Sequence, residues 1–183
     1  MTERWQPETH TFHLRTGEAT ITLQDVEVIY GLHIDGQALY RVEPSHLSYP
    51  QELTRLTGFV PQRDMRGRSR LLRSSLHAHL RLVHLQHPIG EASPQVDVDR
   101  RARLYLLIIF GGIMFPNTLG ADMSMRYLLF IEDLDQLGCY SWGAAVLAYM
   151  YREFDRASMG ERLEVAAFSP LFQSSVGMNE SKE

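Results

Sequence analysis

Leu104-Tyr-Leu-Leu-Ile-Ile-Phe-Gly-Gly-Ile-Met-Phe115 is the longest apolar run in this chain of 183 residues. The run is much shorter than the ~20 residues that a transmembrane helix needs, so it predicts a buried helix and no membrane partner. Residues Trp142–Tyr151 form a second stretch that lacks a polar face over most of its length. Because a helix that is apolar all round must be surrounded by protein, we expect these two helices to lie at the centre of the fold.

Smaller elements are predicted on either side of these helices. Alternating polar and apolar residues predict a hairpin around Thr16-Gly17, and Asp35-Gly36 predicts a second hairpin or at least a turn. Between them, Thr22 can cap a short helix that ends at Gly31. Further helices are predicted over residues 50–57, 69–87 and 123–137. The sequence therefore predicts a mainly α domain with two apolar central helices and small N-terminal β-hairpins.

The composition argues against several classes of enzyme. Of the 18 basic residues, only Lys182 is a lysine. A pyridoxal-phosphate enzyme needs a lysine for its Schiff base, and a P-loop needs one after its glycines. Cys139 is the only cysteine, which excludes a disulfide framework and a cysteine-based zinc cluster. We expect one domain over residues 1–158, followed by a divergent, flexible tail over residues 159–183.

The predicted helix over residues 69–87 carries a basic stripe. At 100° per residue, five cationic or ionisable residues fall on one side of the helix, and Leu72, Leu76, Leu80 and Val83 fall on another face. The stripe consists of Arg70, Arg73, His77, Arg81 and His84. Residues 63–103 hold nine arginines and four carboxylates, whereas the whole chain has a net charge of −4. Arginine suits both phosphates and acidic protein surfaces because its planar guanidinium binds them in bidentate geometry.

Two interpretations of this basic region stay open. It binds an acidic partner or nucleic-acid phosphates, or it is a solvated face whose charges pair within the chain, in particular with Glu132–Asp135. No aromatic side chain lies between Gln62 and Tyr105, which argues against a sequence-specific nucleic-acid reader more than against backbone-phosphate contacts. The candidate partner or nucleic-acid surface comprises Arg66, Arg68, Arg70, Arg73, His77, Arg81 and His84.

The same helix holds the histidines that most resemble a metal site, namely His77, His79, His84 and His87. No carboxylate or thiol accompanies them within the helix, so the ligand set is incomplete. The alternative is that His77 and His84 are solvated and that His79 and His87 pack at the core boundary. We therefore predict no metal and no cofactor.

Nucleophiles and titratable groups elsewhere also have structural explanations. Cys139-Tyr-Ser141 superficially resembles a nucleophile turn, but Ser141 is better placed to cap the following helix, and no Gly-x-Ser-x-Gly is present. Gly111-Gly112 predicts close helix packing, for which Ala144 and Ala148 are candidate partners. Residues near the first hairpin that could titrate are Glu8, His10 and His13. We predict no catalytic residues.

Several segments, taken together and in this order, resemble the plant mobile domain. The matching segments are Glu3–Leu14, Gly17–Asp25, Tyr30–Gly36, Arg103–Gly112, Leu128–Asp135, Tyr140–Ala145 and Tyr151–Glu153. The signature residues, which we expect mainly to build the scaffold, are Trp5, His10, Phe12, Asp25, Gly31, Gly36, Gly111, Gly112, Trp142 and Gly143. After Ser158 the sequence departs from the family's usual Gly-rich turn and Trp-containing helix, which indicates a C-terminally shortened domain.

The resemblance implies a biological setting rather than a reaction. The family, sometimes labelled aminotransferase-like, implies a nuclear role in meristem maintenance, transcriptional regulation and silencing of transposable elements. A phosphatase-7-like protein is an implied partner for some members. The metal-binding motifs of metallophosphatases are absent, and no catalytic residues of the family can be carried over. We therefore expect a non-catalytic nuclear protein-interaction module, with a transposon-derived nucleic-acid-binding domain that uses the arginine-rich helix as the alternative.

Overall fold

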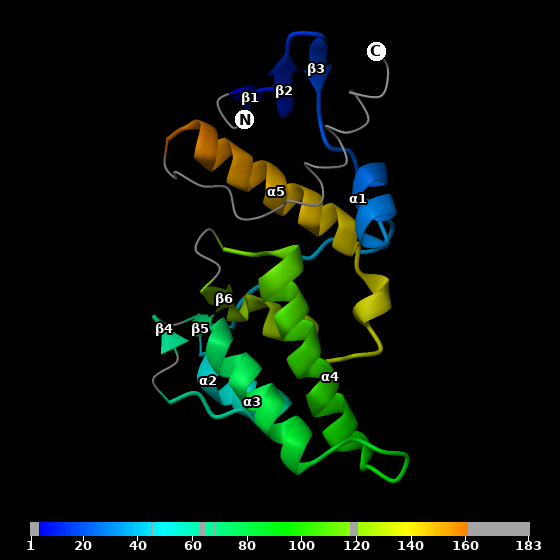
Figure 1. Ribbon diagram of the computed structural model, residues 1–183, viewed down its shortest axis with the longest axis vertical. Helices are drawn as coiled ribbons and strands as arrows, with labels where there is room; N and C mark the ends of the chain where they lie inside the picture. Colours follow the sequence, from blue (N-terminus) through cyan, green and yellow to red (C-terminus); the bar gives the residue numbers. More distant parts are fainter. Residues whose placement is uncertain (1–3, 45, 63–64, 68, 118–120, 161–183) are drawn as a thin grey trace. The chain divides into compact units, whose positions relative to one another are not determined.

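A computed structural model describes residues 4–44, 46–62, 65–67, 69–117 and 121–160 of the chain. The contacts divide the protein into two compact units. Unit 1 combines residues 1–39 with residues 138–183, and unit 2 contains residues 40–137. The predicted, mainly helical character is confirmed, and two small three-stranded antiparallel sheets accompany the helices (Figure 1).

The sheet of unit 1 lies at the start of the chain. Its strands are β1 (Trp5–Gln6), β2 (Thr11–Leu14) and β3 (Gly17–Ala19), in that order across the sheet. Trp5 and Ala19 both pair with Phe12, one on each side. The predicted hairpin around Thr16-Gly17 is therefore confirmed, and β1 extends it by one strand.

The predicted second hairpin at Asp35-Gly36 is wrong, because the chain only bends there. The backbone groups that a hairpin would pair locally bond to a distant segment instead. Gln37 N–H donates to the Cys139 carbonyl (2.7 Å), and Ser141 N–H donates to the Gln37 carbonyl (2.9 Å). A parallel bridge between Gln37 and Tyr140 results.

Two α-helices complete the described part of unit 1. In α1 (Leu23–Tyr30), Thr22 and Asp25 form a capping box, and Gly31 ends the helix in the left-handed conformation (φ 64°), as predicted. The other helix is α5 (Trp142–Ser158). Its buried face meets the sheet and α1 in an apolar core. The core residues of unit 1 include Trp5, Phe12, Ile21, Val26, Val146, Met150 and Phe154.

Unit 2 contains three α-helices and the second sheet within the described residues. The helices are α2 (Tyr49–Thr57), α3 (Arg73–Gln86) and α4 (Gln95–Ile109), and the strands are β4 (Met65–Arg66), β5 (Arg70–Leu72) and β6 (Asp122–Ser124). A π-turn, η2 (Phe110–Met114), and two 3-10 turns, η3 (Met125–Phe130) and η4 (Leu137–Cys139), follow α4. The fully buried side chains include Leu53, Leu71, Leu76, Leu104, Leu107, Met125 and Leu128.

In unit 2 the structure differs from the prediction at two helices. The helix predicted from residue 69 begins only at Arg73, because Arg70–Leu72 pairs as β5 with β4 on one side and β6 on the other. The helix predicted over residues 123–137 does not form, because Met123 pairs with Leu71 in this sheet. The Ser124 hydroxyl then accepts from Arg126 N–H and begins a 3-10 turn instead of an α-helix.

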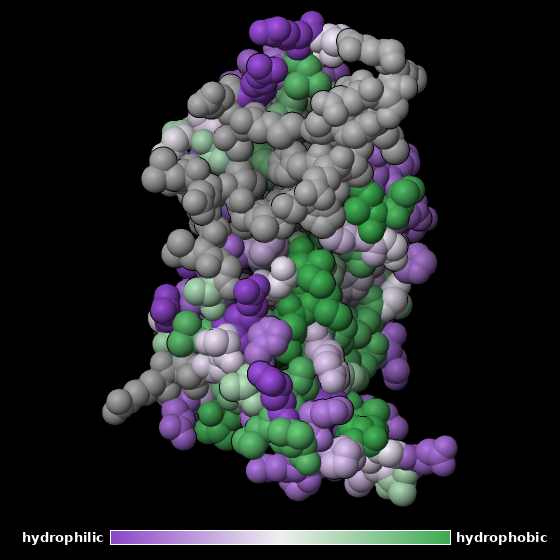
Figure 2. Space-filling view, in the orientation of Figure 1, coloured by the Kyte–Doolittle hydropathy of each residue, from purple (hydrophilic) through white to green (hydrophobic). Residues whose placement is uncertain are grey.

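The two apolar helices belong to different units, α4 to unit 2 and α5 to unit 1. α4 buries Leu104 and Leu107 but exposes Tyr105 (47%) and Ile109 (40%), and Ile113 of η2 is 53% exposed. Figure 2 shows hydrophobic side chains at the surface over this part of unit 2. The prediction that this run is surrounded by protein is therefore wrong. No helix in the described ranges is long and apolar enough to cross a membrane.

Gly111 allows close packing, but against a different partner from the predicted Ala144 and Ala148. A Cβ atom at Gly111 would lie 2.5 Å from Cβ of Met123, so only glycine permits β6 to approach η2 this closely. The packing around Gly112 is looser, since the atom nearest to an added Cβ would be Nη1 of Arg73 at 3.6 Å. Of the two glycines, only Gly111 is therefore required for the close approach of β6 to η2.

Candidate functional site

Part of the predicted basic stripe is present on α3, from Arg73 to Arg81. Arg73, His77 and Arg81 follow one another by a turn on the same helix face and line one pocket of about 540 Å³, together with residues of β5, α3 and the segment before β6. Arg81 and His77 are exposed, and Arg73 is half-buried. Three of the seven predicted surface residues are therefore brought together by the helix itself.

The other predicted members lie elsewhere. Arg66 and Arg70 are cross-strand partners on β4 and β5, so Arg70 is not part of the helical stripe. Nε of Arg66 lies 3.5 Å from Oδ1 of the buried Asp122, which partly neutralises it. Nδ1 of His84 lies 3.5 Å from Nη1 of Arg101, so this histidine turns toward α4. Arg68 lies outside the described residues.

The acidic segment Glu132–Asp135 does not neutralise the stripe in the described part of the chain. The Glu132 carboxylate pairs with Arg55 (2.7 Å) and with Arg41 (3.6 Å). Arg103 donates instead to the backbone carbonyls of Ile131 (2.9 Å) and Glu132 (3.0 Å). The interpretation that the segment pairs with the stripe is therefore wrong for these residues. Salt bridges within the described ranges join none of Arg70, Arg73 and Arg81 to a carboxylate.

The four histidines that most resemble a metal site do not gather at one place. His79 is half-buried and packs against the Phe59 ring (centroids 4.8 Å apart), whereas His77 is exposed. Burial, and secondly the charge of Arg101, lower the pKa of His79 from its usual value. His79 and His87 line a second pocket of unit 2, away from His77. Among the described residues, no group of three or more His, Cys, Asp or Glu side chains could hold a metal ion.

Arg101 is the residue of this region that the sequence analysis missed. Its side chain is only 7% exposed, and Nη2 donates to the carbonyls of Val83 (3.1 Å) and His87 (3.0 Å) at the C-terminal end of α3. Arginine side chains are seldom so buried, so the residue type alone argues against a buried Arg101. The helical periodicity predicts a buried residue here, because Arg101, Leu104 and Leu107 repeat every three residues on the buried face of α4.

Three of the candidate nucleophiles and titratable groups of unit 1, namely Ser141, His10 and His13, have structural partners. The Ser141 hydroxyl donates to the Ile34 carbonyl (2.5 Å) and does not cap α5 through its side chain, contrary to expectation. His13 pairs with Glu18 across the hairpin (3.0 Å), and His10 lies 3.5 Å from the Asp155 carboxylate. The free thiol of Cys139 is exposed.

The signature residues of the resemblance mostly occupy positions where packing or backbone geometry restricts them. Those with buried side chains or buried backbone are Trp5, Phe12, Gly111, Trp142 and Gly143. Asp25 belongs to the capping box of α1, and Gly31 ends that helix. His10 stacks on Tyr151 with centroids 4.9 Å apart. A Cβ atom at Gly36 would meet the Cys139 carbonyl at 2.6 Å, and one at Gly143 would meet Ile34 at 2.9 Å.

The signature residues lie in the sequence segments that resemble one family, and sequence comparison supports the same class of protein. The chain belongs to the plant mobile domain family, whose model matches residues 1–174. The matched range includes residues beyond 158, and residues 161–183 lie outside the described structure, so the predicted domain boundary stays a prediction.

The individual relatives are proteins of Arabidopsis thaliana. Protein MAINTENANCE OF MERISTEMS is 33% identical over 94% of this chain and 35% of its own length, and Protein MAIN-LIKE 1 is 34% identical over 94% and 33%. A serine/threonine-protein phosphatase 7 long form homolog is 33% identical over 86% of this chain and 11% of its own length. The chain thus spans about a third or less of these relatives. No solved structure matches it.

Proposed function

We propose that the chain is a non-catalytic protein-interaction module of the nucleus that acts in meristem maintenance, transcriptional regulation and silencing of transposable elements. The similarity to Protein MAINTENANCE OF MERISTEMS over 94% of the chain supports the biological setting. The match to a phosphatase 7 long form homolog covers only 11% of that relative, so the shared region is a small part of that protein. We propose a phosphatase-7-like protein among the partners.

The proposed interaction rests on one observation. The arginines on the basic face of α3 form no ion pair with a carboxylate of the described residues. Arg73 and Arg81 keep their charges free of carboxylates in the described residues, and Leu85 (80% exposed), four residues after Arg81, lies beside it on the helix surface. A surface that combines guanidinium groups with an exposed leucine complements an acidic protein segment that also carries apolar side chains. We therefore propose an acidic partner protein for α3.

The protein partner is tested by affinity purification of the full chain from plant nuclei, followed by mass spectrometry. We expect Arg73→Glu with Arg81→Glu to lose the proteins that the wild type recovers, because charge reversal repels an acidic partner. Arg4→Glu with Arg15→Glu is the matched control, since both residues are exposed and lie in unit 1. Recovery of the same proteins by both double variants contradicts the proposed surface, and failure to recover any chromatin or phosphatase-like protein contradicts the nuclear setting.

The second candidate function is nucleic-acid binding through the same helix, and the free charges of Arg73 and Arg81 are the observation that favours it. Binding to phosphates releases counterions, so the logarithm of the affinity falls with the logarithm of salt concentration by ~0.9 for each neutralised phosphate of duplex DNA. We expect Arg73→Ala with Arg81→Ala to reduce this slope by up to about two. The measurement is fluorescence anisotropy with duplex DNA over a salt series.

Arg4→Ala with Arg15→Ala is the control for the salt series and should leave the slope unchanged. If the wild type shows no salt-dependent binding, or if the control and the α3 variant change the slope equally, nucleic-acid binding by α3 is wrong. A steep slope that only the α3 variant flattens favours nucleic acid over the acidic partner protein.

A further inference from the structure

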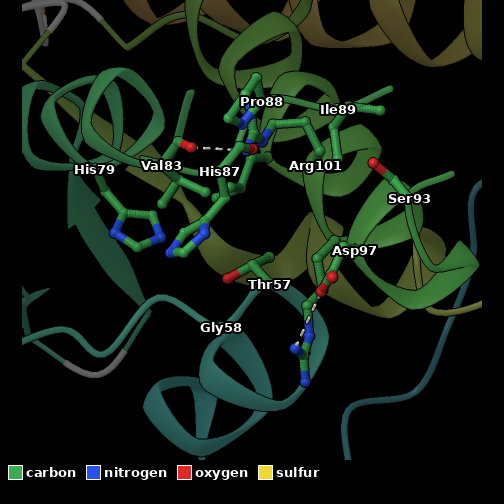
Figure 3. A pocket seen from close by; sticks show the side chains of 12 residues that line it. Thr57, Gly58, His79, Val83, His87, Pro88, Ile89, Ser93, Asp97 and Arg101 are labelled. Carbon is green, nitrogen blue, oxygen red and sulfur yellow. Dashed lines mark hydrogen bonds and ion pairs between the residues drawn. The ribbon is translucent and has the colours of Figure 1, made fainter. Parts of the chain in front are cut away.

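The second pocket of unit 2 lies where three helices meet. It has a volume of about 360 Å³ and is formed by the end of α2, the C-terminal end of α3, and the start of α4 with its preceding loop. Polar groups from all of these segments line it, namely Thr57, His79, His87, Ser93, Arg100 and Arg101. In Figure 3 the imidazoles of His79 and His87 come from one side of the pocket, and Ser93 and Asp97 from the other.

The pocket has more positive than negative charge. Arg101 is nearly completely buried, and the Val83 and His87 carbonyls that accept from it carry no formal charge. Within the described residues, no ion pair joins Arg101 to a carboxylate. Asp97 is the one carboxylate among the lining residues, and it is shared with Arg100, whose Nη1 lies 3.8 Å from Oδ1.

A buried guanidinium without an anion is energetically unfavourable. The carbonyl dipoles at the C-terminal end of α3 offset part of this cost. An anion that enters the pocket offsets more of it, and both Arg100 and Arg101 are placed to contribute. The burial and charge of the site therefore favour an anionic ligand over a neutral one.

An anionic ligand would change the pKa of His79. In the unliganded pocket, burial and the positive charge of Arg101 lower the pKa of His79. An anion beside Arg101 cancels the second of these effects and stabilises the protonated imidazole, so its binding raises the pKa of His79. The neighbouring charged or titratable side chains from the packed elements are His87, Asp97, Arg100 and Arg101.

We propose that this pocket binds a phosphate monoester group. Its available donors, namely the two guanidinium groups, the imidazoles and the Ser93 hydroxyl, converge from α3, α4 and the loop between them, which suits a tetrahedral group with three acceptor oxygens. The Thr57 hydroxyl already donates to the Leu53 carbonyl (2.6 Å). A planar carboxylate needs only one guanidinium fork and leaves the second arginine and the Ser93 hydroxyl without a role. The phosphate comes from a free small molecule or from a phosphorylated side chain, and both present the same chemistry.

The test titrates the full chain with inorganic phosphate, O-phosphoserine and acetate, and follows the imidazole signals of His79 and His87 by NMR. We expect saturable shifts with phosphate, a higher pKa of His79 in the bound state, and much weaker binding of acetate. Tighter binding of O-phosphoserine than of phosphate supports a phosphorylated side chain as the source, and equal binding supports the free group. Equal binding of acetate, or no response at His79, overturns the proposal.

Arg100→Met is the decisive variant. Arg100 is 45% exposed and caps nothing, so the variant should fold, and we expect phosphate to bind about 10-fold more weakly because a charge-assisted contact is lost. Arg126→Met is the matched control, since Arg126 is exposed, pairs with Glu43 (2.9 Å) in the same unit and does not line the pocket. If both variants bind phosphate alike, the pocket is not the site. This outcome leaves the proposed protein partner of α3 unaffected, because neither residue belongs to the stripe.

Discussion

Replacing Trp5 with alanine is expected to lower the free energy of unfolding of unit 1 by about 3–5 kcal/mol. Trp5 is 4% exposed, and its ring centroid lies 4.7 Å from that of Phe12 and 4.9 Å from that of Phe154. Its indole N–H donates to Oδ1 of Asp155 at 2.8 Å. The substitution therefore removes a large apolar ring, leaves a cavity between β1 and α5, and leaves a carboxylate oxygen without this donor.

The measurement is urea unfolding followed by the fluorescence of Trp142, which lies in the same unit. Trp5→Phe keeps a six-membered aromatic ring but loses the hydrogen bond and part of the packed area, so we expect the hydrogen bond to cost about 1 kcal/mol in addition to the loss of packing. Tyr40→Ala is the control, because its side chain is 79% exposed and surface changes usually stay within ±0.5 kcal/mol, as a rough guide. A loss of less than about 1 kcal/mol for Trp5→Ala would show that the aromatic cluster is not packed as described.

Gly36→Ala is expected to have the second largest effect. The backbone at Gly36 has φ 122°, a conformation that costs other residues about 1–3 kcal/mol. In addition, a Cβ atom there would lie 2.6 Å from the carbonyl oxygen of Cys139, which is a backbone atom and cannot rotate away. Relief of this overlap requires the Gln37–Tyr140 bridge to move, and overpacking of this kind costs about 1–3 kcal/mol more.

Gly17→Ala separates these two contributions. Gly17 also has a positive φ, 135°, but no atom lies within 4 Å of an added Cβ. We expect Gly17→Ala to show the conformational cost alone and Gly36→Ala to exceed it by the cost of the overlap, measured by thermal and urea unfolding of both variants. Equal losses of stability at the two positions would mean that the approach of Cys139 to Gly36 is not tight.

Features that depend on neighbouring residues were predictable from the sequence. The capping box of Thr22 and Asp25 and the left-handed glycine at Gly31 are local, so the residue pattern determines them. The amphipathic spacing of Arg73, His77 and Arg81 also follows from the helical period alone. These local rules predicted both α1 and the central part of the candidate surface.

Features that depend on distant partners were not predictable. Arg70–Leu72 has an acceptable helical pattern, but it pairs with Asp122–Ser124, some fifty residues later, and no local signal indicates this strand. The same holds for Glu132, whose partners Arg41 and Arg55 come from another part of the chain. The basic helix was therefore predictable except for its start, and of the two interpretations that stayed open, pairing of the stripe with Glu132–Asp135 is wrong for the described residues.

At Arg101 the sequence contains the relevant signal, but the helical periodicity and the charge of the residue predict opposite degrees of burial. Its spacing from Leu104 places it on the buried face of α4, whereas its charge argues for solvent. The periodicity is the stronger rule here, because the carbonyls of Val83 and His87 accept the guanidinium N–H groups. A charged residue in phase with buried leucines is therefore worth examining as a candidate binding group.

The discontinuity of unit 1 has a consequence for biosynthesis. Its sheet and α1 are made first, but the helix that covers them, α5, leaves the ribosome only after the whole of unit 2. Trp5 and Phe12 therefore stay without Phe154 during synthesis, while unit 2 already has all of its own residues. A folded unit 2 also leaves fewer flexible residues to close between Gln37 and Tyr140, which lowers the entropic cost of joining them. The contacts of α5 with the sheet and α1 therefore form only after unit 2 has been synthesised.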